Sequence, residues 1–165
     1  MNTNYNYKRN TKKLGSNGEQ RAADYLISKN YKILHRNWRT RRGEIDIIAQ
    51  IDDTIVFVEV KTLPSGCLET LEHILGKIKQ KRIAETTKRF LNLYRQYNDS
   101  YIRFDVIVID MPGFDSVYHL ENAFSEPLWI QYKLTEAKNR KYHLIFLRYE
   151  KKFTMQRILM ELFIE

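Results

Sequence analysis

Two consecutive segments of the chain, Glu44–Ile51 and Thr54–Thr62, constrain the fold most strongly. Both are rich in isoleucine and valine, which favour strands, and only Asp52 and Asp53 separate them. A two-residue connection predicts an antiparallel hairpin in which the numbers of paired residues add to 105. A three-residue turn would shift this register by one, and Asp-Asp is a weaker hairpin signal than Asn-Gly.

In the predicted register the hairpin brings acidic residues together. Side chains alternate along a strand, so Glu44 and Asp46 share one face, and Glu59 and Lys61 share a face on the next strand. Asp46 then lies opposite Glu59, and facing carboxylates destabilise a hairpin unless a cation compensates. Carboxylate oxygens are the ligands that Mg²⁺ and Mn²⁺ prefer. The pattern predicts a divalent-metal site; the alternative is an ordinary hairpin face with an ion pair between Glu44 and Lys61.

A helix is predicted before the hairpin. Alanine and leucine residues recur at helical spacing from Ser16, and Ser16 with Glu19 fits a capping box, so the helix is expected to run to about Lys29. The preceding residues, Met1 to Lys13, are polar and without periodicity, which is typical of a mobile basic arm. A strand is expected at Tyr31–Trp38.

The second half of the chain continues the alternation of helix and strand. Pro64 and Gly66 predict a loop after the hairpin, followed by one long helix over Leu68–Tyr97. Strands are expected at Tyr101–Ile109 and Val117–Leu120. Residues 126–165 form a C-terminal extension of unknown role, with a possible strand at Tyr142–Tyr149 and an amphipathic helix at Lys152–Phe163 that favours packing over partner binding.

Composition bounds the class of protein. The 165 residues, of which 43% are hydrophobic and 29% charged, predict one soluble globular domain. A single cysteine, Cys67, excludes an internal disulfide and favours a reducing compartment. The beginning of the chain has no apolar core of the kind that a secretory signal needs, and no apolar run is long enough to span a membrane, so we expect a cytoplasmic protein with no membrane partner.

Positive charge indicates an anionic partner. The formal net charge of +8 favours nucleic acid, although a basic soluble protein without such a partner is the alternative. Two clusters could bind backbone phosphates or could simply be solvated: Arg39, Arg41 and Arg42 before the acidic strand, and Lys77, Lys79, Lys81 and Arg82 on the long helix. The four histidines show no paired metal spacing, so we assign none to catalysis.

Five blocks of sequence carry a family resemblance in matching order and spacing. They are Gly18–Leu26, Arg36–Asn37, Gly43–Ala49, Phe57–Lys61 and Arg103–Val106. These blocks resemble the bacterial UPF0102 (YraN-like) family, from about Leu14 to Phe124. The family is similar to the PD-(D/E)xK nucleases, especially the archaeal Holliday-junction resolvases. The resemblance implies an α/β fold with a restriction-endonuclease-like core, a central mixed β-sheet flanked by helices, over about residues 14–125.

The resemblance also implies roles for individual residues. Asp46 and Glu59 would hold Mg²⁺ or Mn²⁺, and Lys61 would orient the attacking water or stabilise charge at phosphorus. Glu19 matches an additional acid on the first helix, although its capping role alone could explain it. Glu44 and Asp105 are secondary candidates. The simpler alternative for Glu44 is an ion pair with Lys61 and nothing more, and the simpler alternative for Asp105 is to anchor its strand to a basic neighbour.

One departure from the family pattern concerns a phosphate contact. The family often has an arginine two residues after the motif lysine, where this chain has Leu63 followed by Pro64. We therefore expect a metal-dependent endonuclease-like protein that hydrolyses phosphodiester bonds in DNA, with branched structures among the candidate substrates and a homodimer suggested by the resolvases. The alternatives are a non-catalytic nucleic-acid-binding module in a DNA-processing assembly and a purely structural or protein-interaction domain.

Overall fold

A computed structural model describes residues 3–124 of the chain. The predicted C-terminal strand and helix lie outside these residues. The described elements, in chain order, are α1 (Thr3–Ser28), β1 (Lys32–Arg39), β2 (Glu44–Ile51), β3 (Thr54–Thr62), α2 (Leu68–Ile74), α3 (Lys77–Leu93), a short 3-10 turn (Arg95–Tyr97), β4 (Tyr101–Ile109) and β5 (Val117–Leu120). Among these residues no helix is both long and apolar enough to cross a membrane.

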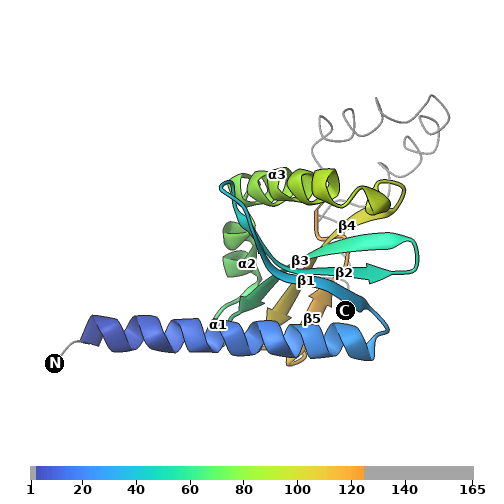
Figure 1. Ribbon diagram of the computed structural model, residues 1–165. Coiled ribbons are helices and arrows are strands. Elements are labelled where there is room, and N and C mark those ends of the chain that lie inside the picture. Colours follow the sequence, from blue (N-terminus) through green and yellow to red (C-terminus); the bar gives the residue numbers. More distant parts are fainter. Residues whose placement is uncertain (1–2, 125–165) are drawn as a thin grey trace.

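The strands form one mixed sheet in the order β1-β2-β3-β4-β5. All neighbouring pairs are antiparallel except β3 and β4, which are parallel and are connected through α2 and α3. Figure 1 shows α1 along one face of the sheet and α2 with α3 on the other. The predicted α/β class and central mixed sheet are confirmed.

Each helix covers the sheet with the apolar face that its sequence provides. On α1, Ala22 and Leu26 lie one turn apart and are fully buried in a cluster with residues such as Val58 of β3. On α3, Ile83 and Phe90 pack in a second cluster with Phe57. Because the two clusters use alternate residues of β3, this strand is buried on both faces. Glu59 of this strand is therefore almost completely removed from solvent.

The hairpin has the predicted register. Ile51 pairs with Thr54 and Ile48 with Phe57, so a two-residue turn connects the strands. Asp52 in the turn has a φ of 48°, a left-handed conformation that aspartate tolerates better than most residues. The pairing of β2 with β3 ends at Ile47 and Val58, one step before Asp46 and Glu59.

The first helix is longer than predicted. It begins at Thr3, so residues 3–13, which we expected to lack regular structure, are helical, and the predicted capping box at Ser16 is wrong because Ser16 lies inside the helix. The segment has no proline, and extending a helix that is already anchored by packing costs far less than nucleating one.

The long predicted helix is divided into two. α2 ends at Ile74, and α3 begins at Lys77 after Gly76, whose φ of −52° and ψ of 161° are not helical. Glycine is a poor helix former, so the chain turns there at little cost. The turn gives α3 its own direction over the sheet.

Gly18 lets α1 approach the end of β3 closely. A Cβ atom at this position would lie 2.2 Å from Oγ1 of Thr62, whereas a Cβ at Gly15, one turn earlier on the same helix, would meet nothing within 4 Å. The absence of a side chain at Gly18 therefore sets the distance between α1 and the strand that carries Glu59 and Lys61.

We predict opposite effects for alanine at these two glycines. Gly18→Ala would force Thr62 to rotate or α1 to move away, at a cost of about 1 to 3 kcal/mol in the free energy of unfolding. Gly15→Ala would stabilise the protein by up to about 1 kcal/mol through helix propensity alone. Urea denaturation would measure both; equal stabilisation by the two substitutions would contradict the close packing at Gly18.

Candidate functional site

Asp46 and Glu59 lie side by side at the point where β2 and β3 separate. Both carboxylates are buried, with 9% and 3% of the residue exposed. Oδ2 of Asp46 accepts a hydrogen bond of 2.8 Å from the backbone N–H of Val60. The backbone pairing of β2 with β3 ends at Ile47, so this side chain continues the contact between the two strands. This bond fixes the Asp46 carboxylate against β3.

Glu59 is paired on one oxygen only. Its Oε1 lies 2.5 Å from Nζ of Lys61 and 2.7 Å from Nζ of Lys79, which reaches the site from α3. Its Oε2 is buried, and no donor among the described residues reaches it. A buried carboxylate oxygen without a partner is costly, which indicates a place for a further hydrogen-bond donor or a cation.

Burial beside Glu59 raises the proton affinity of Asp46. Burial raises the pKa of Asp46 to about 7, and the nearby Glu59 carboxylate adds to this effect by charge repulsion. Burial alone would lower the pKa of Lys61, but attraction to the Glu59 carboxylate outweighs it and leaves the pKa raised. Lys61 therefore stays charged, while Asp46 can exchange a proton near neutral pH.

This donor set fits a divalent cation. Two buried carboxylates, one with an unpartnered oxygen, are ligands that Mg²⁺ and Mn²⁺ prefer, and Mg²⁺ commonly uses only one or two carboxylates with water and phosphate oxygens. Residues 3–124 assemble no group of three or more aspartates, glutamates, histidines or cysteines that could hold a metal ion. Asp46 and Glu59 are thus the two carboxylates that could hold such an ion at this site.

The carboxylate of Glu19, on α1, contacts β1. Its Oε2 accepts a hydrogen bond of 3.0 Å from Nδ2 of Asn37 on β1. Asn37 has a φ of 53° and stands between the residues that pair with Ile45 and Ile47, beside Asp46. The sequence analysis gave Asn37 no role, although it belongs to one of the family blocks; in the structure its side chain connects Glu19 to β1.

Glu44 does not pair with Lys61. Its carboxylate lies 3.1 Å from Nε of Arg39 on β1, while Lys61 turns to Glu59. The alternative interpretation of the hairpin, an ordinary ion pair between Glu44 and Lys61, is therefore wrong. Arg39 was the better partner because it stands directly opposite Glu44 in the β1–β2 ladder.

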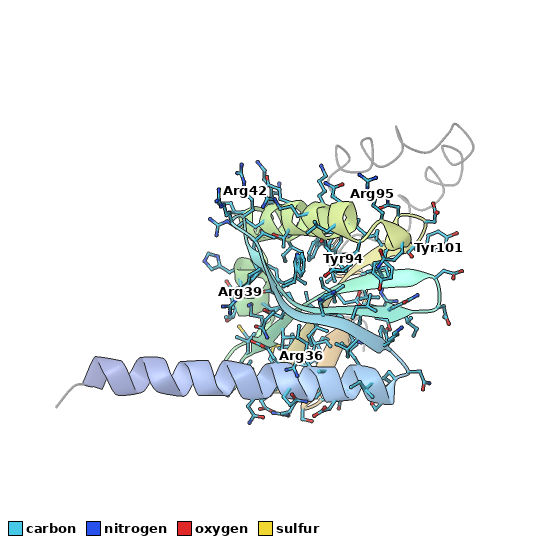
Figure 2. All side chains as sticks on the ribbon, in the orientation of Figure 1. Arg36, Arg39, Arg42, Tyr94, Arg95 and Tyr101 are labelled. Atoms are coloured by element: carbon cyan, nitrogen blue, oxygen red, sulfur yellow. The ribbon has the colours of Figure 1, made fainter. Side chains whose placement is uncertain are left out.

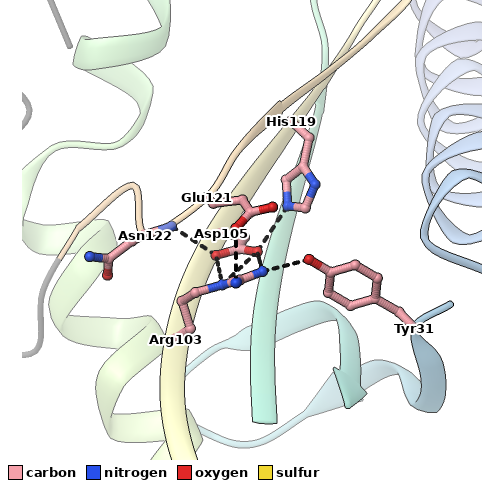
Figure 3. Close-up of polar contacts among 6 residues, drawn as sticks. All are labelled: Tyr31, Arg103, Asp105, His119, Glu121 and Asn122. Carbon is pink, nitrogen blue, oxygen red and sulfur yellow. Dashed lines mark hydrogen bonds and ion pairs between the residues drawn. The ribbon is translucent and has the colours of Figure 1, made fainter. Parts of the chain in front are cut away.

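Asp105 forms a separate buried network (Figure 3). Arg103 donates from Nε and Nη2 to the Asp105 carboxylate, and Nε2 of His119 and the backbone N–H of Asn122 lie 2.8 and 2.9 Å from its oxygens. Burial would raise the pKa of Asp105, but these partners together lower it. Arg103 also donates to the hydroxyl of Tyr31.

This network lies on the opposite face of the sheet from Glu59. Asp105 is the ladder partner of Val58, whose side chain packs under α1, whereas Glu59 points towards α3. The interpretation of Asp105 as an anchor to a basic neighbour thus agrees with its contacts to Arg103. Its carboxylate is fully engaged there.

The two basic clusters lie next to each other. The turn between β1 and β2 packs on α3, where Oγ1 of Thr40 is 3.4 Å from Oγ1 of Thr86 and Gly43 touches Arg82. Figure 2 shows Arg42 at this turn beside α3. The structure leaves six of the seven predicted phosphate-binding residues exposed on these elements and turns the seventh, Lys79, towards Glu59.

Comparison with known proteins agrees with the resemblance. The model of the uncharacterised protein family UPF0102 matches residues 18–109. A UPF0102 protein of Treponema pallidum strain Nichols is 51% identical over 122 residues, covering 72% of this chain and 97% of the relative. Those of Treponema denticola and Geobacter metallireducens are 49% and 46% identical, each covering 68% of this chain and 95% and 93% of the relative. The chain belongs to the UPF0102 family.

The UPF0102 match contains the whole candidate site. Asp46, Glu59, Lys61 and Lys79 all lie within residues 18–109, as does Asp105. The first fifteen residues of α1 and all of β5 lie outside the matched range. The unit that the family model describes is therefore the region that builds the buried acid pair.

The acid pair predicts a distinctive dependence of stability on pH in this UPF0102 protein. Because the pKa of Asp46 rises from 3.8 to about 7 on folding, the folded state binds more protons, and Asp46 makes stability fall as pH rises through this interval. Asp46→Asn keeps an acceptor for Val60 but cannot ionise. In metal-free buffer the variant should gain a few kcal/mol over wild type between pH 4 and 7, since each pKa unit corresponds to about 1.4 kcal/mol.

Urea denaturation at several pH values would measure this gain. Asp53→Asn, in the exposed hairpin turn, is the control and should follow the wild-type profile. Parallel profiles for Asp46→Asn and wild type would contradict a raised pKa at Asp46.

Proposed function

We propose that this protein is a divalent-metal-dependent nuclease that hydrolyses phosphodiester bonds in DNA. The observation that carries the proposal is the buried pair Asp46 and Glu59: no donor within residues 3–124 reaches Oε2 of Glu59, and Lys61 lies on the same carboxylate. We also propose that the sheet with its flanking helices is a restriction-endonuclease-like core. The order β2-β3, crossover helices and parallel β4 supports this assignment.

The residues of the site would divide the work as follows. Asp46 and Glu59 would hold Mg²⁺ or Mn²⁺, which supplies charge stabilisation and activates water for attack. Lys61, charged and fixed by Glu59, would stabilise the negative charge that develops on the phosphoryl oxygens. The water oxygen forms a bond to phosphorus, the bond from phosphorus to the leaving oxygen breaks, and the proton released by the water ends on that leaving oxygen.

Charge around the site supports an extended anionic substrate. The exposed arginines of the β1–β2 turn and the cations of α3 flank the site. On the other side, α1 crosses the end of β3 at Gly18 and continues past the sheet (Figure 1). The sequence of this continuation, residues 3–17, has four lysines and arginines and no acid. A nucleic-acid backbone at the site would meet positive elements on both sides.

The proposal predicts metal-dependent cleavage that needs both acids. We would incubate labelled single-stranded, duplex, flapped and four-way-junction DNA with Mg²⁺, Mn²⁺ or EDTA. Wild type should cut at least one substrate with metal and none with EDTA, and Asp46→Asn and Glu59→Gln should each lower the rate by a factor of about 10² or more. Asp53→Asn should cut like wild type.

A binding protein without catalysis is the second candidate. It is favoured by the two ammonium groups on Oε1 of Glu59, which partly neutralise the acid pair without a metal. Absence of cleavage on every substrate, together with salt-sensitive DNA binding, would support this candidate and overturn the nuclease. If the protein neither cuts nor binds any of these DNA substrates, the proposal that it acts on them is overturned.

DNA binding should depend on the paired basic clusters. Arg42→Ala and Arg82→Ala should each weaken binding and lower the slope of log affinity against log salt by about 1, as expected for loss of one phosphate contact. Lys32→Ala, an exposed cation at the other end of β1, is the matched control. Fluorescence anisotropy at several salt concentrations would measure the slopes, and equal effects of all three substitutions would exclude a localised surface.

A further inference from the structure

Lys79 stands apart from the other cations of α3. Its side chain is 28% exposed and ends 2.7 Å from Oε1 of Glu59, whereas Lys77, Lys81 and Arg82 are exposed. The helix explains the difference: Lys79 precedes the buried Ile83 by four residues, which places both on the face turned towards the sheet. Position on the helix therefore selects Lys79 for the site.

Two ammonium groups on Oε1 of Glu59 oppose the binding of a metal at the other oxygen, Oε2, through charge repulsion. A divalent cation bound by Asp46 and Glu59 would lie within a few ångströms of both lysines, and like charges at this distance repel strongly in a buried site. Lys61 belongs to β3 itself, two residues from Glu59 and on the same face of a buried strand. Lys79 comes from a different element, so it is the cation that can leave while β3 stays in place.

We propose that Lys79 exchanges between two partners: it pairs with Glu59 in the metal-free protein and, when a divalent cation takes this carboxylate, it binds a phosphate of the nucleic acid. This inference rests on the proposed nuclease function and adds a site residue to it. The displaced ammonium has Arg82 as its neighbour three residues further along α3, so it adds one cation to a helix that already exposes Lys77, Lys81 and Arg82. Metal binding thereby prepares the site for its substrate.

The exchange predicts opposite changes in two measurements. Lys79→Met removes the competitor, so the affinity for Mn²⁺ without DNA, measured by isothermal titration calorimetry, should rise on the order of tenfold, a typical coupling between two binding events. The same variant should bind DNA more weakly and cut it more slowly in saturating Mn²⁺. A lysine with a purely structural role would lower metal affinity and cleavage together when it is removed.

Two variants separate this effect from general charge loss. Lys81→Met removes an exposed cation two residues away and should leave Mn²⁺ affinity near that of wild type. Lys79→Arg keeps the charge and should keep Mn²⁺ affinity low, and it provides a folded alternative if Lys79→Met is unstable.

The outcomes distinguish the two proposals. Mn²⁺ binding that is equal in wild type, Lys79→Met and Lys79→Arg would overturn the exchange and leave the nuclease proposal intact. Mn²⁺ binding that is absent from wild type and from Lys79→Met would overturn both, because the acid pair would then hold no metal. Tighter Mn²⁺ binding by Lys79→Met with undiminished DNA binding and cleavage would overturn the phosphate-binding part.

Discussion

The main constraint on the candidate site is the burial of two carboxyl groups side by side at one end of a hairpin. Asp46 and Glu59 are almost completely removed from solvent, and isolated ionised carboxylates are among the most expensive groups to bury. The protein compensates with one backbone N–H for Asp46 and two ammonium groups for Glu59, yet leaves one carboxylate oxygen without a donor among the described residues. An oxygen left without a partner is expected where a ligand supplies the missing contact.

The two faces of the sheet resolve the same problem in different ways. On the α1 side, Asp105 is also fully buried, but Arg103, His119 and Asn122 satisfy it from neighbouring positions on β4 and β5 and just after β5. A satisfied network of this kind fixes the geometry of the strands and leaves no coordination free. On the α3 side, Glu59 has partners on Oε1, but no described residue donates to its Oε2. Both acids are buried, so it is their hydrogen bonds that distinguish Asp105, a structural acid, from Glu59, a candidate ligand.

The sequence predicted most of the sheet because local signals there agree with tertiary packing. Runs of isoleucine and valine predicted β2, β3 and β4 with their observed bounds, β5 was also predicted with its observed bounds, and the Asp52-Asp53 turn predicted the register. The helices were less predictable. The beginning of α1 has no strong local signal, and the break at Gly76 competes with good helix formers on both sides. In the site, the positions of Asp46, Glu59 and Lys61 followed from strand parity.

Contacts between distant segments could not be read in this way. Lys79 follows Glu59 by twenty residues and appeared to be one of four similar cations, and only the direction of α3 over the sheet shows that it points inward. That direction follows from the turn at Gly76 and from the packing of Ile83 and Phe90 against β3. The acid pair is thus encoded locally in a hairpin, whereas its charge balance is encoded by the packing of a helix. A substitution in the α3 core that tilts the helix would move Lys79 away from Glu59 without changing any residue of the motif.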